Sequence, residues 1–424
     1  MSSPYTSPLA AEVGPDVLDR FLRYVRIDTQ AEEGVAAFPS TQKQLDLSRL
    51  LLRELEEMGA AEAALDEHGY VTATLKATDG DGAPTVGLLA HVDTSPEAAG
   101  AGVEPRVLRG YDGGAIRYPA DPSLVLTPED SPALRECVGK DIVTSDGTTL
   151  LGADDKAGVA AIMAAARYLL EHPEVPHGRV RIAFTVDEEV GRGVDLFDIQ
   201  GFGADIAYTI DGADRGSIED ETFSARQAVV SFIGNNTHPG YAKDKLLNSI
   251  RMAAAFVERL PRDLAPETTA GRDGFVHPWS IAGGCDKTVV KVLARDFDDD
   301  VLEGHVQLIR RAAEDAAATV SGGRVDVEVV EQYRNMRSYL EGDGRPVQIA
   351  ERAIRAAGLE PRRGAIRGGT DGARLTERGL PTPNLFAGMH EIHSTREWVC
   401  VQDMADAVAT IVHLVRLWGE ESSA

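Results

Sequence analysis

The chain has 424 residues, of which 43% are hydrophobic and 26% charged, so it is long enough for two domains or one large α/β unit. Its formal net charge of -25 argues against nucleic acid and anionic membranes as partners, because both require a basic face. Three cysteines lie far apart in the sequence, and no apolar run reaches the ~18 residues that span a bilayer. No apolar segment precedes Arg20 as in a secretion signal, and we therefore expect a cytoplasmic protein without disulfides.

The first half of the chain alternates helical and strand-like segments. Apolar residues recur at helical spacing in some segments, and others are short apolar runs typical of buried strands. We expect helices at 16–26, 44–58 and about 156–171, and strands at 85–91, 179–186 and 205–210. Between them, residues 94–146 are rich in Gly and Pro and show little periodicity. Strands that alternate with helices indicate an α/β sheet with a large parallel component.

The pattern changes after about residue 223. The order becomes βαββαβ, which is typical of a compact α+β unit. Its strands are expected at 227–234, 275–281, 288–297 and 324–330, and its helices at 246–260 and 299–319. The α/β pattern returns from about 338, with helices near 346–357 and 402–418. We therefore predict one domain made of 1–223 and 338–424, with a second domain, 224–337, inserted into it.

Several expected strands end in acidic residues or histidine. The stretches concerned are HVDT with His91 and Asp93, LLGADD with Asp154, VDEEVG with Glu188 and Glu189, TIDG with Asp211, and MHEIHSTREW with His393. Each alone has an ordinary explanation as a semi-buried histidine, a solvated acidic loop or a turn. Ligands of open α/β sheets bind outside the carboxyl ends of the strands, where these groups could converge. Together they form the nitrogen and oxygen ligand set that zinc uses.

The neighbouring acids Asp154 and Asp155 in LLGADDKAG have two interpretations. They could cap the following helix, since acidic residues are favoured at helix N-termini. They could also bind a cation. A carboxylate has two oxygens, so one Asp could bridge two metal ions, and a two-metal site acidifies the water that attacks the substrate. A carboxylate that binds no metal could then accept the proton of that water and pass it to the leaving amine.

At the level of motifs the chain resembles the peptidase T family of di-zinc exopeptidases, which are tripeptide aminopeptidases related to aminoacylases and glutamate-releasing carboxypeptidases. The resemblance covers about residues 15–418. It rests on HVDTSPE, TSDGTTLLGADDKAG, VDEEVG, NNTHPGYAK, ARDFD, RGGTDGA and LPTPNLFAG, in that order. It implies a zinc-exopeptidase-type mixed sheet with flanking helices and an inserted α+β lid domain.

The resemblance also implies the ligands of two zinc ions per chain, for which Mn²⁺ or Co²⁺ could substitute. His91, Asp154 and Asp211 would hold one ion, and Asp154, Glu189 and His393 the other. Asp154 would be the bridge, followed by a cis peptide bond that turns Asp155 away from the metals. His390 is a competing candidate, but the family ligand corresponds to His393.

The remaining roles follow from the same resemblance. Glu188 would be the general base, and Asp93 would orient His91. His238 in the inserted domain would stabilise the oxyanion when that domain closes. Arg295 and Arg367 would bind the terminal carboxylate of the substrate, because a guanidinium matches carboxylate geometry, although Arg295 could instead form a surface ion pair with Asp296.

We therefore expect a metallo-aminopeptidase that releases the N-terminal residue of short peptides, chiefly tripeptides. The nearest alternative is another di-zinc amidohydrolase, such as a dipeptidase, an aminoacylase or a carboxypeptidase, because it would share all of these ligands. A silent peptide-binding protein is disfavoured because Glu188 and all ligands are present. A Ser or Cys hydrolase is disfavoured because the sequence has no GxSxG motif. A homodimer remains open.

Overall fold

The computed structural model describes residues 4–78 and 82–421, which group into two compact units. Unit 1 comprises Met1–Asp220, Tyr339–Gly364 and Thr370–Ala424, and unit 2 comprises Glu221–Ser338 and Ala365–Gly369. The short piece Ala365–Gly369 lies between the second and third segments of unit 1 but belongs to unit 2, a detail that the sequence pattern does not indicate. The role of unit 2 as a lid stays a prediction.

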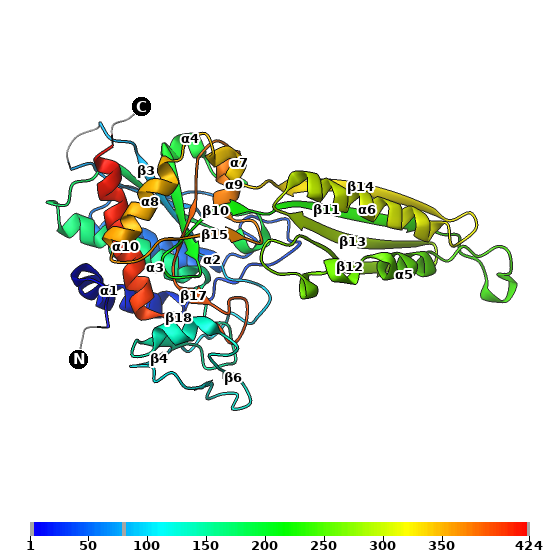
Figure 1. The fold of residues 1–424 in the computed structure, drawn as a ribbon, viewed down its shortest axis with the longest axis horizontal. Coiled ribbons are helices and arrows are strands. Elements are labelled where there is room, and N and C mark those ends of the chain that lie inside the picture. Colours follow the sequence, from blue (N-terminus) through cyan, green and yellow to red (C-terminus); the bar gives the residue numbers. More distant parts are fainter. Residues whose placement is uncertain (1–3, 79–81, 422–424) are drawn as a thin grey trace. The chain divides into compact units, whose positions relative to one another are not determined.

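The core of unit 1 is an eight-stranded mixed sheet (Figure 1), in the order β1-β2-β8-β3-β9-β16-β10-β15. Its strands are β1 (Ala61–Leu65), β2 (Val71–Leu75), β3 (Val86–His91), β8 (Val180–Thr185), β9 (Ile206–Gly212), β10 (Ser217–Thr222), β15 (Arg362–Ile366) and β16 (Asn384–Phe386). The neighbours β8, β3, β9 and β16 are parallel, whereas β1, β2 and β10 pair antiparallel. This confirms the expected α/β sheet with a large parallel part.

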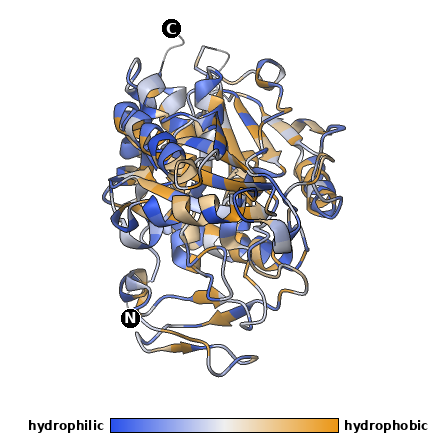
Figure 2. Ribbon diagram, turned by 90° about the vertical axis from the view of Figure 1, so that its right-hand side faces the viewer, coloured by the Kyte–Doolittle hydropathy of each residue, from blue (hydrophilic) through white to orange (hydrophobic). Residues whose placement is uncertain are grey.

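Helices cover the sheet of unit 1 and bury its hydrophobic residues. They are α1 (Pro8–Tyr24), α2 (Gln44–Met58), α3 (Ala153–Glu171), α4 (Ile199–Phe202), α8 (Arg345–Ala356), α9 (Asp371–Glu377) and α10 (Val401–Gly419). The short helix α7 (Arg337–Leu340) begins in unit 2 and ends in unit 1. The long helix α3 packs on β3 and β9, and α10 packs on α1, α3 and α8. The central strands β3 and β8 are buried along their whole length, and most of the strand ribbon has the colour of hydrophobic residues in Figure 2.

Residues 94–146 contain short elements that the sequence pattern does not reveal. These are β4 (Arg106–Leu108), β5 (Ile116–Arg117), β6 (Val125–Leu126), the 3-10 turn Pro132–Cys137 and β7 (Ile142–Thr144). Strand β7 pairs with β18 (Trp398–Cys400), which in turn pairs with β17 (Met389–His390). This small sheet joins the region to the C-terminal segment and has its own hydrophobic cluster, which includes Trp398.

Unit 2 has the expected βαββαβ order. Its elements are β11 (Ser224–Ile233), α5 (Ser249–Arg259), β12 (Phe275–Gly283), β13 (Lys287–Asp296), α6 (Asp299–Ala317) and β14 (Arg324–Tyr333). The strands form an antiparallel sheet in the order β12-β13-β11-β14. Asn248 and Asp298 cap the two helices by accepting backbone N–H groups, as residues of these types do at helix N-termini. Alternate residues of β13 point into a hydrophobic cluster with both helices.

Most expected elements begin and end within a few residues of the observed ones. The main difference is α1, which starts at Pro8 instead of residue 16, with Ser7 as its cap. Within residues 4–78 and 82–421, no helix combines the length and apolar character that crossing a membrane requires.

Candidate functional site

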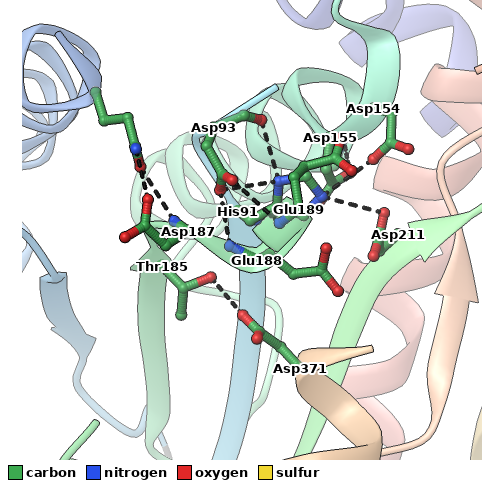
Figure 3. A network of polar contacts seen from close by, with 12 residues as sticks. His91, Asp93, Asp154, Asp155, Thr185, Asp187, Glu188, Glu189, Asp211 and Asp371 are labelled. Atoms are coloured by element: carbon green, nitrogen blue, oxygen red, sulfur yellow. Dashed lines mark hydrogen bonds and ion pairs between the residues drawn. The ribbon is translucent and has the colours of Figure 1, made fainter. Parts of the chain in front are cut away.

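The structure brings the five expected metal ligands together at one edge of the unit 1 sheet. Figure 3 shows four of them, His91, Asp154, Glu189 and Asp211. All five come from strand ends or from the segments that follow strands. His91 ends β3, Asp211 lies near the end of β9, Glu189 lies in the 3-10 turn Glu188–Val190 after β8, Asp154 begins α3, and His393 lies between β17 and β18. The strand-end pattern therefore corresponds to a real cluster of side chains.

Asp154 lies at the centre of the cluster. Its Oδ1 is 3.0 Å from Nε2 of His91, and its Oδ2 is 3.4 Å from Nε2 of His393. On the first side, Oδ1 of Asp211 is 3.7 Å from His91 Nε2. On the second side, Oε2 of Glu189 is 2.8 Å from His393 Nε2. The two oxygens of the Asp154 carboxylate thus face two separate pairs of possible metal ligands, as a bridging ligand requires. One pair is His91 and Asp211, and the other is His393 and Glu189.

Asp155 has a structural task beside the cluster. The peptide bond between Asp154 and Asp155 is cis, as the family resemblance implies. Asp155 also lies near His91 and Asp211 in a possible ligand group. However, its Oδ2 accepts the backbone N–H of His91 at 3.2 Å, and its Oδ1 accepts that of Gly158 at 3.1 Å. Asp155 therefore holds the backbone of β3 and α3 in place.

Asp93 connects two parts of the site. The Nδ1 of His91 lies 3.1 Å from the carbonyl oxygen of Asp93 and 3.4 Å from its Oδ1. The Asp93 carboxylate also accepts the backbone N–H groups of Glu188 and Glu189, both at 3.1 Å. Asp93 is fully buried, so these contacts are shielded from water. Its position fits the expected task of orienting His91, and it also fixes the turn that carries Glu188 and Glu189.

Both histidines lie between carboxylates, which shift their pKa values upward. Burial lowers the pKa of His91, but its hydrogen bonds with Asp154, Asp211 and Asp93 outweigh burial and raise that pKa well above its ordinary value. Burial also lowers the pKa of His393, yet hydrogen bonds with Asp154 and Glu189 raise it to about 12. The same carboxylates would attract a metal ion, which histidine binds in its neutral form.

The carboxyl groups respond to burial and to one another. Burial and the charge of Asp154 raise the pKa of Glu189 to about 8 and that of Asp211 to about 6. Burial also raises the pKa of Asp154, but the hydrogen bonds from His393 and His91 hold it below its ordinary value. Burial is the main reason that the pKa of Glu188 lies well above its usual range. Such crowding of carboxylates calls for a cation.

The donors present fit a pair of metal ions. Among the described residues, Glu189 Oε1 is a buried oxygen without a hydrogen-bond partner. Ligand atoms of His91, Asp154 and Glu189 lie within 4.8 Å of one another. An unpartnered buried carboxylate oxygen is unfavourable, and a bound cation would remove that penalty. Histidine nitrogens with carboxylate oxygens suit zinc and also accept manganese or cobalt.

Four further residues support the site and were not identified from the sequence. Glu397 accepts three backbone N–H groups around Asp154, and an oxygen of Glu97 lies 3.0 Å from His393 Nδ1. Asn384 accepts the backbone N–H of Asp211. Asp371 accepts a hydrogen bond from the Thr185 hydroxyl. Glu97 and Glu397 stand within motifs that flank the ligands, HVDTSPE and HSTREW, and this proximity is the only signal for them. The competing candidate His390 stacks on Trp398, with ring centroids 4.3 Å apart, and is not part of the ligand cluster.

The two arginines expected to bind substrate lie in unit 2 and differ in their contacts. The Arg367 Nη1 donates to the carbonyls of Gly271 and Asp273, both at 2.8 Å, and its Nη2 donates to Thr269 at 3.1 Å. Both arginines lie over aromatic rings. The Cζ of Arg295 is 5.7 Å from the centroid of Phe275 and 5.9 Å from that of Tyr333, and the Cζ of Arg367 is 5.2 Å from the centroid of Phe223. The Nε of Arg295 is buried without a hydrogen-bond partner among the described residues. Arg295 therefore has one unpaired donor, Nε, whereas both Nη groups of Arg367 are engaged.

His238 is exposed at the start of the 3-10 turn Pro239–Tyr241 in unit 2. Its Nδ1 accepts the backbone N–H of Gly240 at 3.1 Å. A neutral imidazole that accepts at Nδ1 carries its proton on Nε2. The local structure therefore leaves Nε2–H available as a donor, which the expected oxyanion role requires.

A second group of possible ligands is formed by Cys137, Cys400 and Asp403, all buried. Asp403 already has two cationic partners, Lys140 Nζ at 2.8 Å and Arg215 Nε at 3.4 Å. These charges balance the carboxylate and would repel a metal ion, so this group is not a comparable site. Cys137, Cys285 and Cys400 are free thiols in the structure.

Comparison with known proteins shows the family of the chain. Residues 146–417 match the model of peptidase family M20/M25/M40. Peptidase T of Geobacillus thermodenitrificans is 44% identical over 408 residues, which cover 96% of this chain and 99% of the relative. Peptidase T of Clostridium acetobutylicum is 43% identical, with 96% of this chain and 100% of the relative covered.

Solved structures show the same fold. Aminopeptidase PepT from Bacillus cereus superposes with a TM-score of 0.73 at 25% identity, covering 96% of this chain and 98% of the other. A tripeptidase from Staphylococcus aureus gives 0.74 at 22% identity, covering 96% and 99%. These findings confirm the predicted resemblance and fold class. The chain is a peptide hydrolase of the peptidase family M20/M25/M40, with peptidase T enzymes as full-length relatives.

Proposed function

We propose that the chain releases the N-terminal residue of tripeptides with the help of two metal ions held by unit 1. The observation that carries this proposal is the position of Asp154, whose two oxygens face His91 and His393 separately. His91, Asp154 and Asp211 would hold one ion, and Asp154, Glu189 and His393 the other. When bound, two zinc ions supply Lewis acidity to the attacking water and the scissile carbonyl, and Mn²⁺ or Co²⁺ are alternatives.

Glu188 is the proposed general base. Its backbone N–H is fixed by Asp93, and its side chain makes no hydrogen bond to either ligand histidine among the described residues. Burial raises the pKa of Glu188 well above its usual range. A carboxylate with a raised pKa retains the proton it takes from water long enough to give it to the leaving amine. Asp93 acts indirectly, by holding Glu188 and His91.

We propose that Arg295 binds the terminal carboxylate of the peptide and that Arg367 mainly holds the segment 269–273. The unpaired Nε of Arg295 and the engaged Nη groups of Arg367 support this division. His238, with its proton on Nε2, is the proposed donor to the oxyanion. A carboxylate-binding arginine would limit the length of the substrate, because the peptide has to end where the arginine lies.

The test is a substrate panel on the zinc-loaded chain. It compares one tripeptide with its dipeptide, tetrapeptide and N-acetyl analogues, for the wild type, Glu188→Gln and the exposed control Glu57→Gln. We expect release of the N-terminal residue from the tripeptide alone, a loss of at least about 100-fold in kcat for Glu188→Gln, and no change for the control. Preferential cleavage of the N-acetyl form or of dipeptides would reassign the chain to the alternative, another di-zinc amidohydrolase.

Short peptides are the proposed partners, and the acidic charge of -25 remains unfavourable for nucleic acid and anionic membranes. We propose a cytoplasmic location, which the sparse free cysteines support, because disulfides are frequent in secreted proteins. A homodimer remains a prediction, to be checked by light scattering of the metal-loaded chain.

A further inference from the structure

Glu397 holds the segment that carries the bridging Asp154. Its side chain is 1% exposed and lies just before β18, distant in sequence from that segment. Its Oε2 accepts the N–H groups of Leu151 and Gly152, both at 2.7 Å. Its Oε1 accepts the N–H of Asp154 at 2.9 Å. One buried carboxylate thus binds three backbone groups directly before and at the shared ligand.

The N-cap residue of α3 does not itself accept a hydrogen bond from the start of the helix. Gly152 stands at the N-cap of α3 with φ of 78°, and it has no side chain that could cap the helix. Asp154 also departs from helical geometry, with φ of -80° and ψ of 106°. The first N–H groups of a helix need acceptors from outside it. Glu397 provides these acceptors, so the conformation of Asp154 depends on a residue of the C-terminal segment.

The same C-terminal segment also carries a ligand. His393 and Glu397 both stand in the motif HSTREW. The Nε2 of His393 lies 3.4 Å from Asp154 Oδ2. Movement of this stretch would therefore shift a ligand and the anchor of the bridge together. Asn384 contacts only one of the five ligands. Its Oδ1 accepts the backbone N–H of Asp211 and the hydroxyl of Thr209.

We propose that Glu397 is a positioning residue for both metal ions, acting through the backbone of Asp154. This inference rests on the proposed function, since it takes Asp154 as the bridge. Loss of Glu397 would weaken both metal positions together. Loss of Asn384 would weaken only the position that includes Asp211. Partners of metal ligands typically change metal affinity by about 10- to 100-fold when removed.

The experiment titrates metal-free protein with Co²⁺ and follows its visible absorption. It compares the wild type with Glu397→Gln, Glu397→Asp and Asn384→Ala. Glutamine keeps the size of the side chain but points an N–H₂ group at backbone donors. We expect Glu397→Gln to weaken both Co²⁺ binding steps by about 10-fold or more and to alter the spectrum of both ions. Asn384→Ala should weaken one step only.

The outcomes separate this inference from the proposed function. A wild type that binds fewer than two Co²⁺ ions and cleaves no tripeptide would overturn the proposed function. A wild type that binds two ions, together with wild-type affinities and spectra in Glu397→Gln, would overturn the positioning role alone. Weakening of one step only in Glu397→Gln would also overturn it. If circular dichroism shows that Glu397→Gln does not fold, Glu397→Asp decides by the same criteria, because it keeps the charge and shortens its reach.

Discussion

The three consecutive acids Asp187, Glu188 and Glu189 have three different surroundings. Asp187 accepts hydrogen bonds from Ser40 and Gln44 and is fully buried away from the ligands. Among the described residues Glu188 makes no hydrogen bond to a ligand histidine, whereas Glu189 contacts His393. The sequence alone shows only an acidic run, and the family resemblance was needed to distinguish base from ligand. The surroundings that separate them come from residues far away in the sequence.

The two arginines of unit 2 should differ when each is replaced. We expect Arg295→Ala to raise KM for a tripeptide by about 30-fold, because a charge-assisted hydrogen bond contributes about 2 kcal/mol. The effect should vanish for the tripeptide amide, which lacks the terminal carboxylate. Arg367→Ala should mainly lower the melting temperature, since its donors hold residues 269–273. Steady-state kinetics on both substrates check this, with the exposed Arg311→Ala as control.

Glu219 should make stability fall as pH rises. Burial raises its pKa from 4.5 to about 7, although Ser217 and Asn384 donate hydrogen bonds to it. Between these values the folded chain holds a proton that the unfolded chain has released, so the stabilising contribution is complete below pH 4.5 and is lost as pH rises to about 7. In Glu219→Gln the free energy of unfolding should decline by up to about 3 kcal/mol less over this pH range than in the wild type. Urea unfolding at several pH values measures it, and parallel curves for variant and wild type would refute it.

Helices and strands in which apolar residues recur at regular spacing were predictable from the sequence, and very short strands were not. The helix expected at 44–58 is α2 with the same bounds, and the strand expected at 85–91 is β3 within one residue. Strands such as β5, β16 and β17 span only two or three residues, which is too short for a period to emerge. Their places are set by pairing with distant segments, as β17 pairs with β18.

The packing of α3 on β9 brings Asp154 and Asp211 together and depends on Gly158. A Cβ at this position would lie 1.9 Å from the carbonyl oxygen of Ile210. Helix propensity alone predicts that Gly158→Ala stabilises α3 by about 1 kcal/mol. We expect instead a destabilisation of about 1–3 kcal/mol, because the helix must move away from the strand.

A matched glycine separates the two effects in thermal unfolding. Gly304 lies within α6 and is exposed, and a Cβ at this position would meet no atom within 4 Å. Gly304→Ala should therefore raise stability by about the propensity difference, near 1 kcal/mol. Equal shifts of the same sign in both variants would show that the contact with Ile210 does not limit the packing of α3.

At the scale of the whole molecule, the sequence predicted which residues form the cluster of possible ligands, but it did not predict the order of the strands in the sheet. The strand order β1-β2-β8-β3-β9-β16-β10-β15 places β16 beside β9, although they are far apart in sequence. Such pairing is decided by the total burial of many side chains, which no local pattern encodes. The anchors Glu97 and Glu397 were missed for the same reason, since their partners lie in other segments.

All five proposed ligands belong to unit 1, and each unit has its own hydrophobic cluster. Metal removal should therefore destabilise unit 1 and leave unit 2 almost unchanged. A ligand at 100 times its Kd stabilises the folded state by about 2.7 kcal/mol per site. We expect scanning calorimetry of the metal-loaded chain to resolve two transitions, of which a chelator lowers only one. Glu189→Gln should lower that same transition before chelation, because it removes a ligand charge while the cluster of unit 2 is untouched. If chelator lowered both transition temperatures equally, the two units would unfold together as one cooperative unit. The prediction that metal binding stabilises unit 1 alone would then be wrong.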